Sequence, residues 1–170
     1  GIGKNLQDHL QIRTAFKVKK VKTLNQMYHS YLSLGKMGLE YLLFKRGPLT
    51  MAPSQFGIFT KSDERFDTPN IEFHVQPLSL DKFGDPLHNF PALTVSVCNL
   101  RPKSRGTVSL TSSNPMDQPK IAPNYLTDPE DKEVAVESIK KARNLMATKR
   151  MAIFEPDEFL PGKNLTKHKD

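Results

Sequence analysis

The chain has 170 residues, one cysteine and a formal net charge of +7 at neutral pH. This length suffices for one domain with a sizeable core, and the single Cys98 excludes an internal disulfide. No run approaches the roughly 20 apolar residues of a membrane-spanning helix, so membrane insertion is not expected for this segment. An unpaired cysteine is typical of a reducing compartment, and we therefore expect a cytoplasmic location.

The first predicted element is a strand within residues 10–22, where apolar and polar residues alternate loosely. Part of the positive charge lies here, in the run "KVKKVK" at 17–22. Such a run can bind phosphate groups or can be the solvated face of a strand. No aromatic stacking pattern accompanies the lysines, which favours the solvated strand and no nucleic-acid partner.

Helical spacing of apolar residues follows over residues 24–45. Gly35 and Gly38 weaken the middle of this segment, so it can form two shorter helices. The pair Gly47 and Pro48 ends the helical pattern, and a short strand is expected at about 55–60.

Three segments alternate between apolar and polar residues, which is typical of half-buried strands: 71–76, 92–100 and 106–112. No helical pattern separates them, and this arrangement predicts an antiparallel sheet with one apolar and one polar face. A helix over 128–147 is then expected to cover the apolar face. The fold class is therefore α+β, an antiparallel sheet of about five or six strands with helices packed on one face.

The helix over 128–147 carries clear start signals. Asp128 suits the N-cap position and Pro129 suits the first helical position. Beyond residue 149 the pattern is lost, and we expect an irregular C-terminal segment.

The sequence contains none of the complete motifs that mark an active site. There is no G-x-S-x-G, no G-x-G-x-x-G, no H-E-x-x-H and no paired C-x-x-C, so we expect neither a catalytic triad nor a zinc site. The remaining signal is the polar face of the sheet, because polar side chains on such a face must meet solvent or a ligand. The substrate-binding candidates on it are Gln55, Glu72, His74, Gln76 and Asn99.

Three ordered blocks resemble the glucose–methanol–choline (GMC) family of flavin oxidoreductases. "GIGKNLQDH" at 1–9 resembles the family pattern G-[VI]-G-x-N-L-x-D-H. "LRPKSRGTVSLTSSNP" at 100–115 resembles its R-P-x-S-R-G-x-V-x-L block, and "PKIAPNYLTDPEDKE" at 119–133 is similar to the block that follows. The order and the spacing of the blocks also fit, with the similarity closest to bacterial choline and alcohol dehydrogenases.

This resemblance implies the substrate-binding domain of an FAD-dependent enzyme that oxidises a small alcohol by passing hydride to the flavin. Such enzymes hold FAD on an N-terminal Rossmann unit and carry their catalytic base in an H-P-x-G-T-C block, and this chain contains neither motif. We therefore expect no catalytic base and no FAD in the chain by itself. The alternative is a non-catalytic module whose basic surface binds an anionic partner.

The resemblance also implies a division of the chain. Residues 1–9 would be a junction from the missing FAD-binding domain, 10–150 the substrate-binding domain, and 151–170 an irregular segment leading back to the flavin domain.

Particular residues take roles from the same comparison. Asn5, Asp8 and His9 resemble a segment that lies near the flavin, although His9 can equally make only local hydrogen bonds. Arg101 and Arg105 of "RPKSRG" are expected to form structural hydrogen bonds rather than catalytic contacts.

Overall fold

The computed structural model describes residues 1–52, 54–82 and 84–166. The strands are β1 Lys4–Leu6, β2 Gln11–Lys17, β3 Phe56–Thr60, β4 Ile71–Gln76, β5 Ala92–Asn99, β6 Gly106–Ser109, β7 Lys120–Ala122 and β8 Asp157–Leu160. The helices are α1 Leu24–Tyr28, α2 Tyr31–Phe44, α3 Pro129–Met146 and α4 Lys149–Ala152, with a short 3₁₀ turn at Pro48–Thr50.

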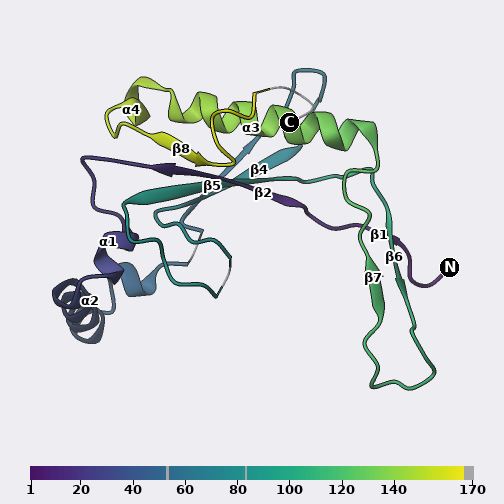
Figure 1. The fold of residues 1–170 in the computed structure, drawn as a ribbon, viewed down its shortest axis with the longest axis horizontal. Coiled ribbons are helices and arrows are strands. Elements are labelled where there is room, and N and C mark those ends of the chain that lie inside the picture. The colour runs from purple at the N-terminus through teal and green to yellow at the C-terminus, as the bar shows by residue number, and fades with distance from the viewer. Residues whose placement is uncertain (53, 83, 167–170) are drawn as a thin grey trace.

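The strands form two antiparallel sheets. The larger sheet has the order β3-β4-β5-β2-β8, and the smaller has the order β1-β6-β7. In Figure 1 the small sheet lies at one end of the molecule, where the β6–β7 hairpin extends away from the body. The prediction of an α+β fold built on antiparallel pairing is confirmed.

Helix α3 covers one face of the large sheet, as Figure 1 shows. Its start follows the sequence signals, because Asp128 accepts a hydrogen bond from the backbone N–H of Glu130 at 2.8 Å and Pro129 takes the first helical position. The core lies between this helix and the sheet and contains Phe16, Ile71, Phe73, Val95, Val97, Val134, Ala142 and Met146. Helices α1 and α2 lie on the opposite side of the sheet.

The segment 24–45 forms two helices, as the sequence allowed, but the break lies elsewhere. It falls at His29 and Ser30, where the Ser30 hydroxyl accepts from the Ser33 backbone N–H at 3.3 Å and caps α2. Both glycines stay inside α2. The side chains that α2 exposes to solvent are largely apolar and include Tyr31, Leu32, Leu39, Leu42, Leu43 and Phe44.

The expectation of an irregular segment beyond residue 150 is wrong. Residues 149–152 form α4, and β8 pairs with β2 at the edge of the large sheet. The expected segment also includes 167–170, which lie outside the described residues.

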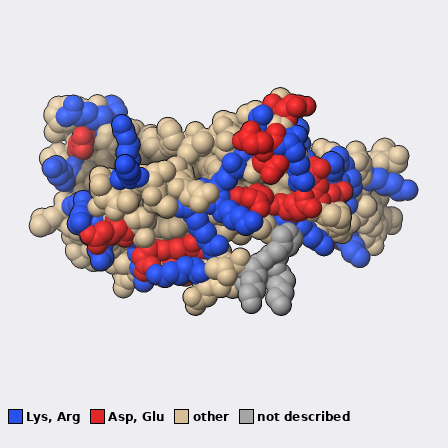
Figure 2. All heavy atoms as spheres, turned by 90° about the horizontal axis from the view of Figure 1, so that it is seen from above, with Lys and Arg blue, Asp and Glu red and all other residues tan. Residues whose placement is uncertain are grey.

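In the described ranges, no helix combines the length and the apolar character needed to cross a bilayer. Figure 2 looks onto the molecule from above, the α3 side of Figure 1. Acidic and basic side chains are interleaved across that face.

Candidate functional site

The polar face of the large sheet lies opposite the face that α3 covers. Strand pairing sets its pattern, because residues directly across from each other in neighbouring strands share a face. Glu72 of β4 pairs with Cys98 of β5, and His74 pairs with Ser96. Gln76, the third sequence candidate on β4, lies on the same face two residues further along. The prediction that these three β4 side chains share one face agrees with the register.

Glu72 and His74 form the centre of this face. The His74 Nε2 atom lies 3.6 Å from Glu72 Oε2, and the side chains are 28% and 20% exposed, respectively. Cys98 is buried beside them, and burial followed by the charge of Glu72 raises the pKa of its thiol. Gln76 is also buried, and its amide donates to the Ser54 hydroxyl at 3.2 Å. The face is therefore polar, partly enclosed and open at Glu72 and His74.

Two of the predicted residues lie apart from this centre. Asn99 projects toward α3, where its amide donates to Asp131 Oδ1 at 3.1 Å. The reason is the period of two along β5, which places Asn99 on the same face as buried Val97. Gln55 precedes β3, is exposed, and lines a shallow hollow together with Leu93. The structure thus groups three of the five predicted substrate residues.

The candidate cofactor residues lie along the N-terminal turn, and all three are exposed. Asn5 lies in β1 with a positive φ of 71°. The His9 ring contacts the Leu100 carbonyl at 3.2 Å, and the Asp8 carboxylate accepts a hydrogen bond from the Tyr125 hydroxyl. This hydrogen bond lowers the pKa of Asp8 and raises the pKa of Tyr125. Asp8 and His9 therefore both make contacts within the chain.

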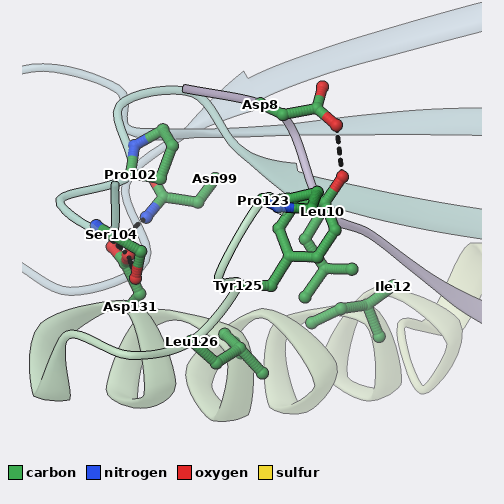
Figure 3. A pocket seen from close by; sticks show the side chains of 11 residues that line it. Asp8, Leu10, Ile12, Asn99, Pro102, Ser104, Pro123, Tyr125, Leu126 and Asp131 are labelled. Atoms are coloured by element: carbon green, nitrogen blue, oxygen red, sulfur yellow. Dashed lines mark hydrogen bonds between the residues drawn. The ribbon is translucent and has the colours of Figure 1, made fainter. Parts of the chain in front are cut away.

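A cavity lies between this turn and the start of α3, and Figure 3 shows its lining. Asp8 and Tyr125 point toward each other at one side, and Ser104 and Asp131 meet at the other. Leu10, just before β2, and Ile12, within it, supply apolar walls. The two members of each pair hydrogen-bond to each other, so the cavity presents mainly apolar surface.

The carboxylate of Asp131 organises the "RPKSRG" loop. It accepts hydrogen bonds from the Ser104 hydroxyl at 2.5 Å, from the Ser104 N–H at 2.7 Å and from the Lys103 N–H at 2.9 Å. Burial by itself raises the pKa of Asp131, but these hydrogen bonds and the charge of Arg105 outweigh it, so the pKa is lowered.

The two arginines of this loop bind backbone carbonyls. Arg105 donates to the carbonyl groups of Pro102 at 2.6 Å and Ser104 at 3.0 Å. Arg101 donates to the Thr68 hydroxyl at 2.9 Å and to the Pro69 carbonyl at 3.3 Å. The prediction that these arginines form structural hydrogen bonds is confirmed.

Ser79, His88 and Asp81 form a chain of side-chain contacts in the segment between β4 and β5. The Ser79 hydroxyl lies 2.9 Å from His88 Nδ1, and His88 Nε2 lies 3.2 Å from Asp81. Ser79 is only 1% exposed, and its backbone N–H is bound by the buried amide of Asn25. A nucleophile must reach its substrate, so this chain of groups holds the loop after β4 rather than catalysing acyl transfer.

The sequence of this chain is similar to those of known oxidoreductases. A family described as GMC oxidoreductase matches residues 102–169. An alcohol dehydrogenase (acceptor) of Pseudomonas putida is 40% identical over 166 residues, which is 97% of this chain and 30% of the relative. An oxygen-dependent choline dehydrogenase of Vibrio vulnificus is 32% identical over 165 residues, 97% of this chain and 29% of that protein. The chain therefore spans about 30% of the length of these relatives.

Solved structures share the fold. A formate oxidase of Aspergillus oryzae superposes with a TM-score of 0.81 at 19% identity, covering 99% of this chain and 34% of that one. An FAD-dependent oxidoreductase from Chaetomium thermophilum gives a TM-score of 0.79 at 19% identity, covering 99% and 35%. The motif blocks, the family match and the relatives along nearly the whole chain agree, and the chain belongs to the GMC oxidoreductase family.

Proposed function

We propose that this chain supplies the substrate-binding part of an FAD-dependent enzyme that oxidises a small alcohol. The observation that carries the proposal is the partly enclosed pair of Glu72 and His74 on the polar sheet face. The relatives named alcohol dehydrogenase and choline dehydrogenase support the reaction class. The alcohol would lie against this face, and the apolar face would serve only to anchor the sheet to α3.

The chemistry of the two side chains suits an alcohol. A neutral imidazole can accept the hydroxyl proton of the substrate or donate a hydrogen bond to its oxygen, and a carboxylate orients the ring or attracts a cationic group nearby. Glu72 and His74 come from one strand, so the backbone fixes their spacing. Gln76 and Ser54 extend the polar surface at one end. A flavin bound beside this face would supply the hydride acceptor.

The described residues fit only the margin of an FAD site. Phosphate binding in dinucleotide folds needs a glycine-rich turn between a parallel strand and a helix N-terminus. Every strand pairing in the described ranges is antiparallel. Asn5, Asp8 and His9 remain exposed along one edge and could contact a flavin held mainly by other protein. We propose that an FAD-binding domain of the same protein provides that cradle.

The exposed apolar side chains of α2 support a larger assembly. Leu32 is 89% exposed and Tyr31 is 93% exposed, and large exposed apolar patches mark contacts with other protein. The unpaired Cys98 also fits the proposed cytoplasmic location.

The test uses the longer protein that carries this chain together with an FAD-binding domain. His74→Ala should lower kcat/KM for the best alcohol by at least about tenfold, the effect of losing one hydrogen bond to a charged or reacting group. Flavin content and thermal stability should stay near the parent values. Glu137→Gln, on the exposed side of α3, is the matched control and should leave the kinetics unchanged. Unchanged kinetics in both Glu72→Gln and His74→Ala would place the alcohol elsewhere.

A further inference from the structure

Three potential metal ligands converge on the polar sheet face. A carboxylate oxygen of Glu72, a ring nitrogen of His74 and the sulfur of Cys98 all lie within 4.8 Å of one another. Two of the ligands come from β4 and one from β5, and about 24 residues of sequence separate them. The sequence motifs of zinc sites space their ligands along one segment, so no such motif marks this cluster.

The strand register creates this convergence. Glu72 and Cys98 are directly paired across the β4–β5 ladder, and such partners have Cβ atoms about 5 Å apart. His74 follows Glu72 by two residues, which keeps its side chain on the same face. The three Cα positions are therefore fixed by two central strands of the sheet, and only side-chain torsions need to adjust.

The donor set selects a class of ion. Thiolate, imidazole and carboxylate ligands together favour Zn²⁺ and similar thiophilic divalent ions over Mg²⁺ or Ca²⁺, which prefer oxygen alone. Bonds of about 2.0–2.3 Å in a tetrahedron place ligand atoms about 3.3–3.6 Å apart. The His74–Glu72 distance of 3.6 Å already meets this value. The Cys98 sulfur lies within 4.8 Å of both other ligand atoms, and side-chain torsions of Glu72 and His74 can bring them closer to it.

Burial also suits a metal site. Cys98 is 4% exposed, so its sulfur lies at the bottom of the cluster. The Glu72 and His74 side chains remain 20% and 28% exposed and leave a path from solvent. Zinc sites that keep an open coordination position have three protein ligands and a water molecule or substrate as the fourth.

We propose that Glu72, His74 and Cys98 form a binding site for one Zn²⁺-like divalent ion. On binding, the S–H bond of Cys98 breaks, its proton passes to solvent, and a sulfur–metal bond forms. The thiolate and the Glu72 carboxylate then balance the two positive charges of the ion, and no electron is transferred. A further consequence rests on the proposed function: an ion here would occupy the alcohol site and inhibit the enzyme reversibly.

The binding experiment needs neither flavin nor alcohol, so its failure and the failure of the proposed function are separable. The purified 170-residue chain, reduced and freed of metal, is titrated with CoCl₂ and followed by absorption. One equivalent of Co²⁺ should produce a sulfur-to-cobalt charge-transfer band and the visible bands of a tetrahedral site. Because Cys98 is the only cysteine, the charge-transfer band can come from no other residue. One equivalent of ZnCl₂ should abolish both sets of bands, and a titration without the charge-transfer band overturns the proposal.

Variants locate the ligands. Cys98→Ser should remove the charge-transfer band, and His74→Ala and Glu72→Gln should each weaken Zn²⁺ binding in calorimetry by at least about tenfold, the smallest loss typical of altered metal sites. His29→Gln is the matched control, because the His29 side chain is exposed and its ring contacts the Leu87 carbonyl and the Tyr28 ring, away from the three ligands, and this variant should bind as the parent does. Circular dichroism checks folding. Equal Zn²⁺ affinity in the parent and all three ligand variants would place the ion elsewhere and overturn the proposal. If a variant fails to fold, the cobalt spectrum of the parent chain decides whether Cys98 binds the metal.

Discussion

Ser104 and Asp131 are joined twice, through the hydroxyl of Ser104 at 2.5 Å and through its backbone N–H at 2.7 Å. The Ser104 hydroxyl oxygen in turn accepts hydrogen bonds from the N–H groups of Thr127 and Asp128, both at 3.1 Å. One buried serine therefore connects the "RPKSRG" loop to the first turn of α3. A serine suits this position because its hydroxyl donates to Asp131 and accepts from two backbone N–H groups at the same time.

Removal of the Asp131 carboxylate should destabilise the chain. Asp131→Ala leaves the Ser104 and Lys103 donors without their acceptor, and each unsatisfied buried group costs about 1–3 kcal/mol. We expect the free energy of unfolding to fall by about 2–4 kcal/mol in urea titrations. Glu137→Gln on the same helix removes only an exposed ion pair and should change it by less than about 0.5 kcal/mol. Equal effects of the two substitutions would contradict this role.

The same carboxylate should make stability depend on pH. The folded-state pKa of Asp131 is lowered, so its stabilising contribution is fully present above the unfolded value of about 3.9 and is lost as pH falls through the folded value. The difference in unfolding free energy between the parent and Asp131→Asn should be largest near neutral pH and shrink below about pH 4. Denaturant titrations at a series of pH values measure it, and a difference that stays constant down to pH 2 would refute the assignment.

Sequence patterns predicted the elements whose determinants are local. The alternation in 71–76 and the Asp128–Pro129 start signal identified a strand and a helix close to their observed bounds. The polar face followed from the same alternation, which places Glu72 and His74 on the same side of β4. Asn99 does not lie on that face, because the two-residue period of β5 puts it on the side of Val97, where its amide donates to Asp131 of α3.

Features set by long-range contacts were beyond a local reading. Strand β8 has the sequence "DEFL", too short and too polar to stand out, and it exists through pairing with β2 about 140 residues earlier. The position of Cys98 beside Glu72 depends on the β4–β5 register, which no local pattern specifies. The alternation of Glu72 and His74 could be read from the sequence. The proximity of Cys98 to them became visible only in the structure.

Arg143 should hold β8 to α3. Its guanidinium makes two parallel hydrogen bonds to Glu158, both at 2.8 Å, and Glu158 is only 6% exposed. Arg143→Ala leaves that buried carboxylate without its cation, with the Gly162 N–H still donating to it at 3.2 Å, and breaking such a pair costs about 3 kcal/mol. Thermal unfolding and hydrogen exchange at β8 measure the loss. Lys140→Ala, which removes an exposed partner of Glu137, should cost less than about 0.5 kcal/mol; a similar cost for both would show that the Arg143 pair contributes little.

Two glycines should respond oppositely to alanine. A Cβ at Gly106 would lie 2.3 Å from the Ala122 carbonyl oxygen and 2.7 Å from Pro123 Cα, both backbone atoms of the neighbouring strand region. Gly106→Ala should therefore cost about 2 kcal/mol or more through strain between β6 and β7. Gly35 lies inside α2 with open space around it, and Gly35→Ala should stabilise the chain by about 0.5–1 kcal/mol. Urea titrations of both variants decide the matter, and a neutral Gly106→Ala would mean that the hairpin can shift freely.

The 170-residue chain alone should bind FAD too weakly to retain it. Binding must offset about 4–15 kcal/mol of lost translational and rotational freedom, and the phosphate cradle that normally helps to do so is absent from the described residues. Asn5, Asp8 and His9 offer only exposed contacts along one edge. The chain mixed with FAD should therefore leave gel filtration colourless and should not oxidise alcohols. Bovine serum albumin of equal concentration controls for nonspecific retention. A yellow peak with one flavin per chain would contradict the prediction; loss of that flavin in Asp8→Ala and His9→Ala would then assign the cradle to the N-terminal turn itself.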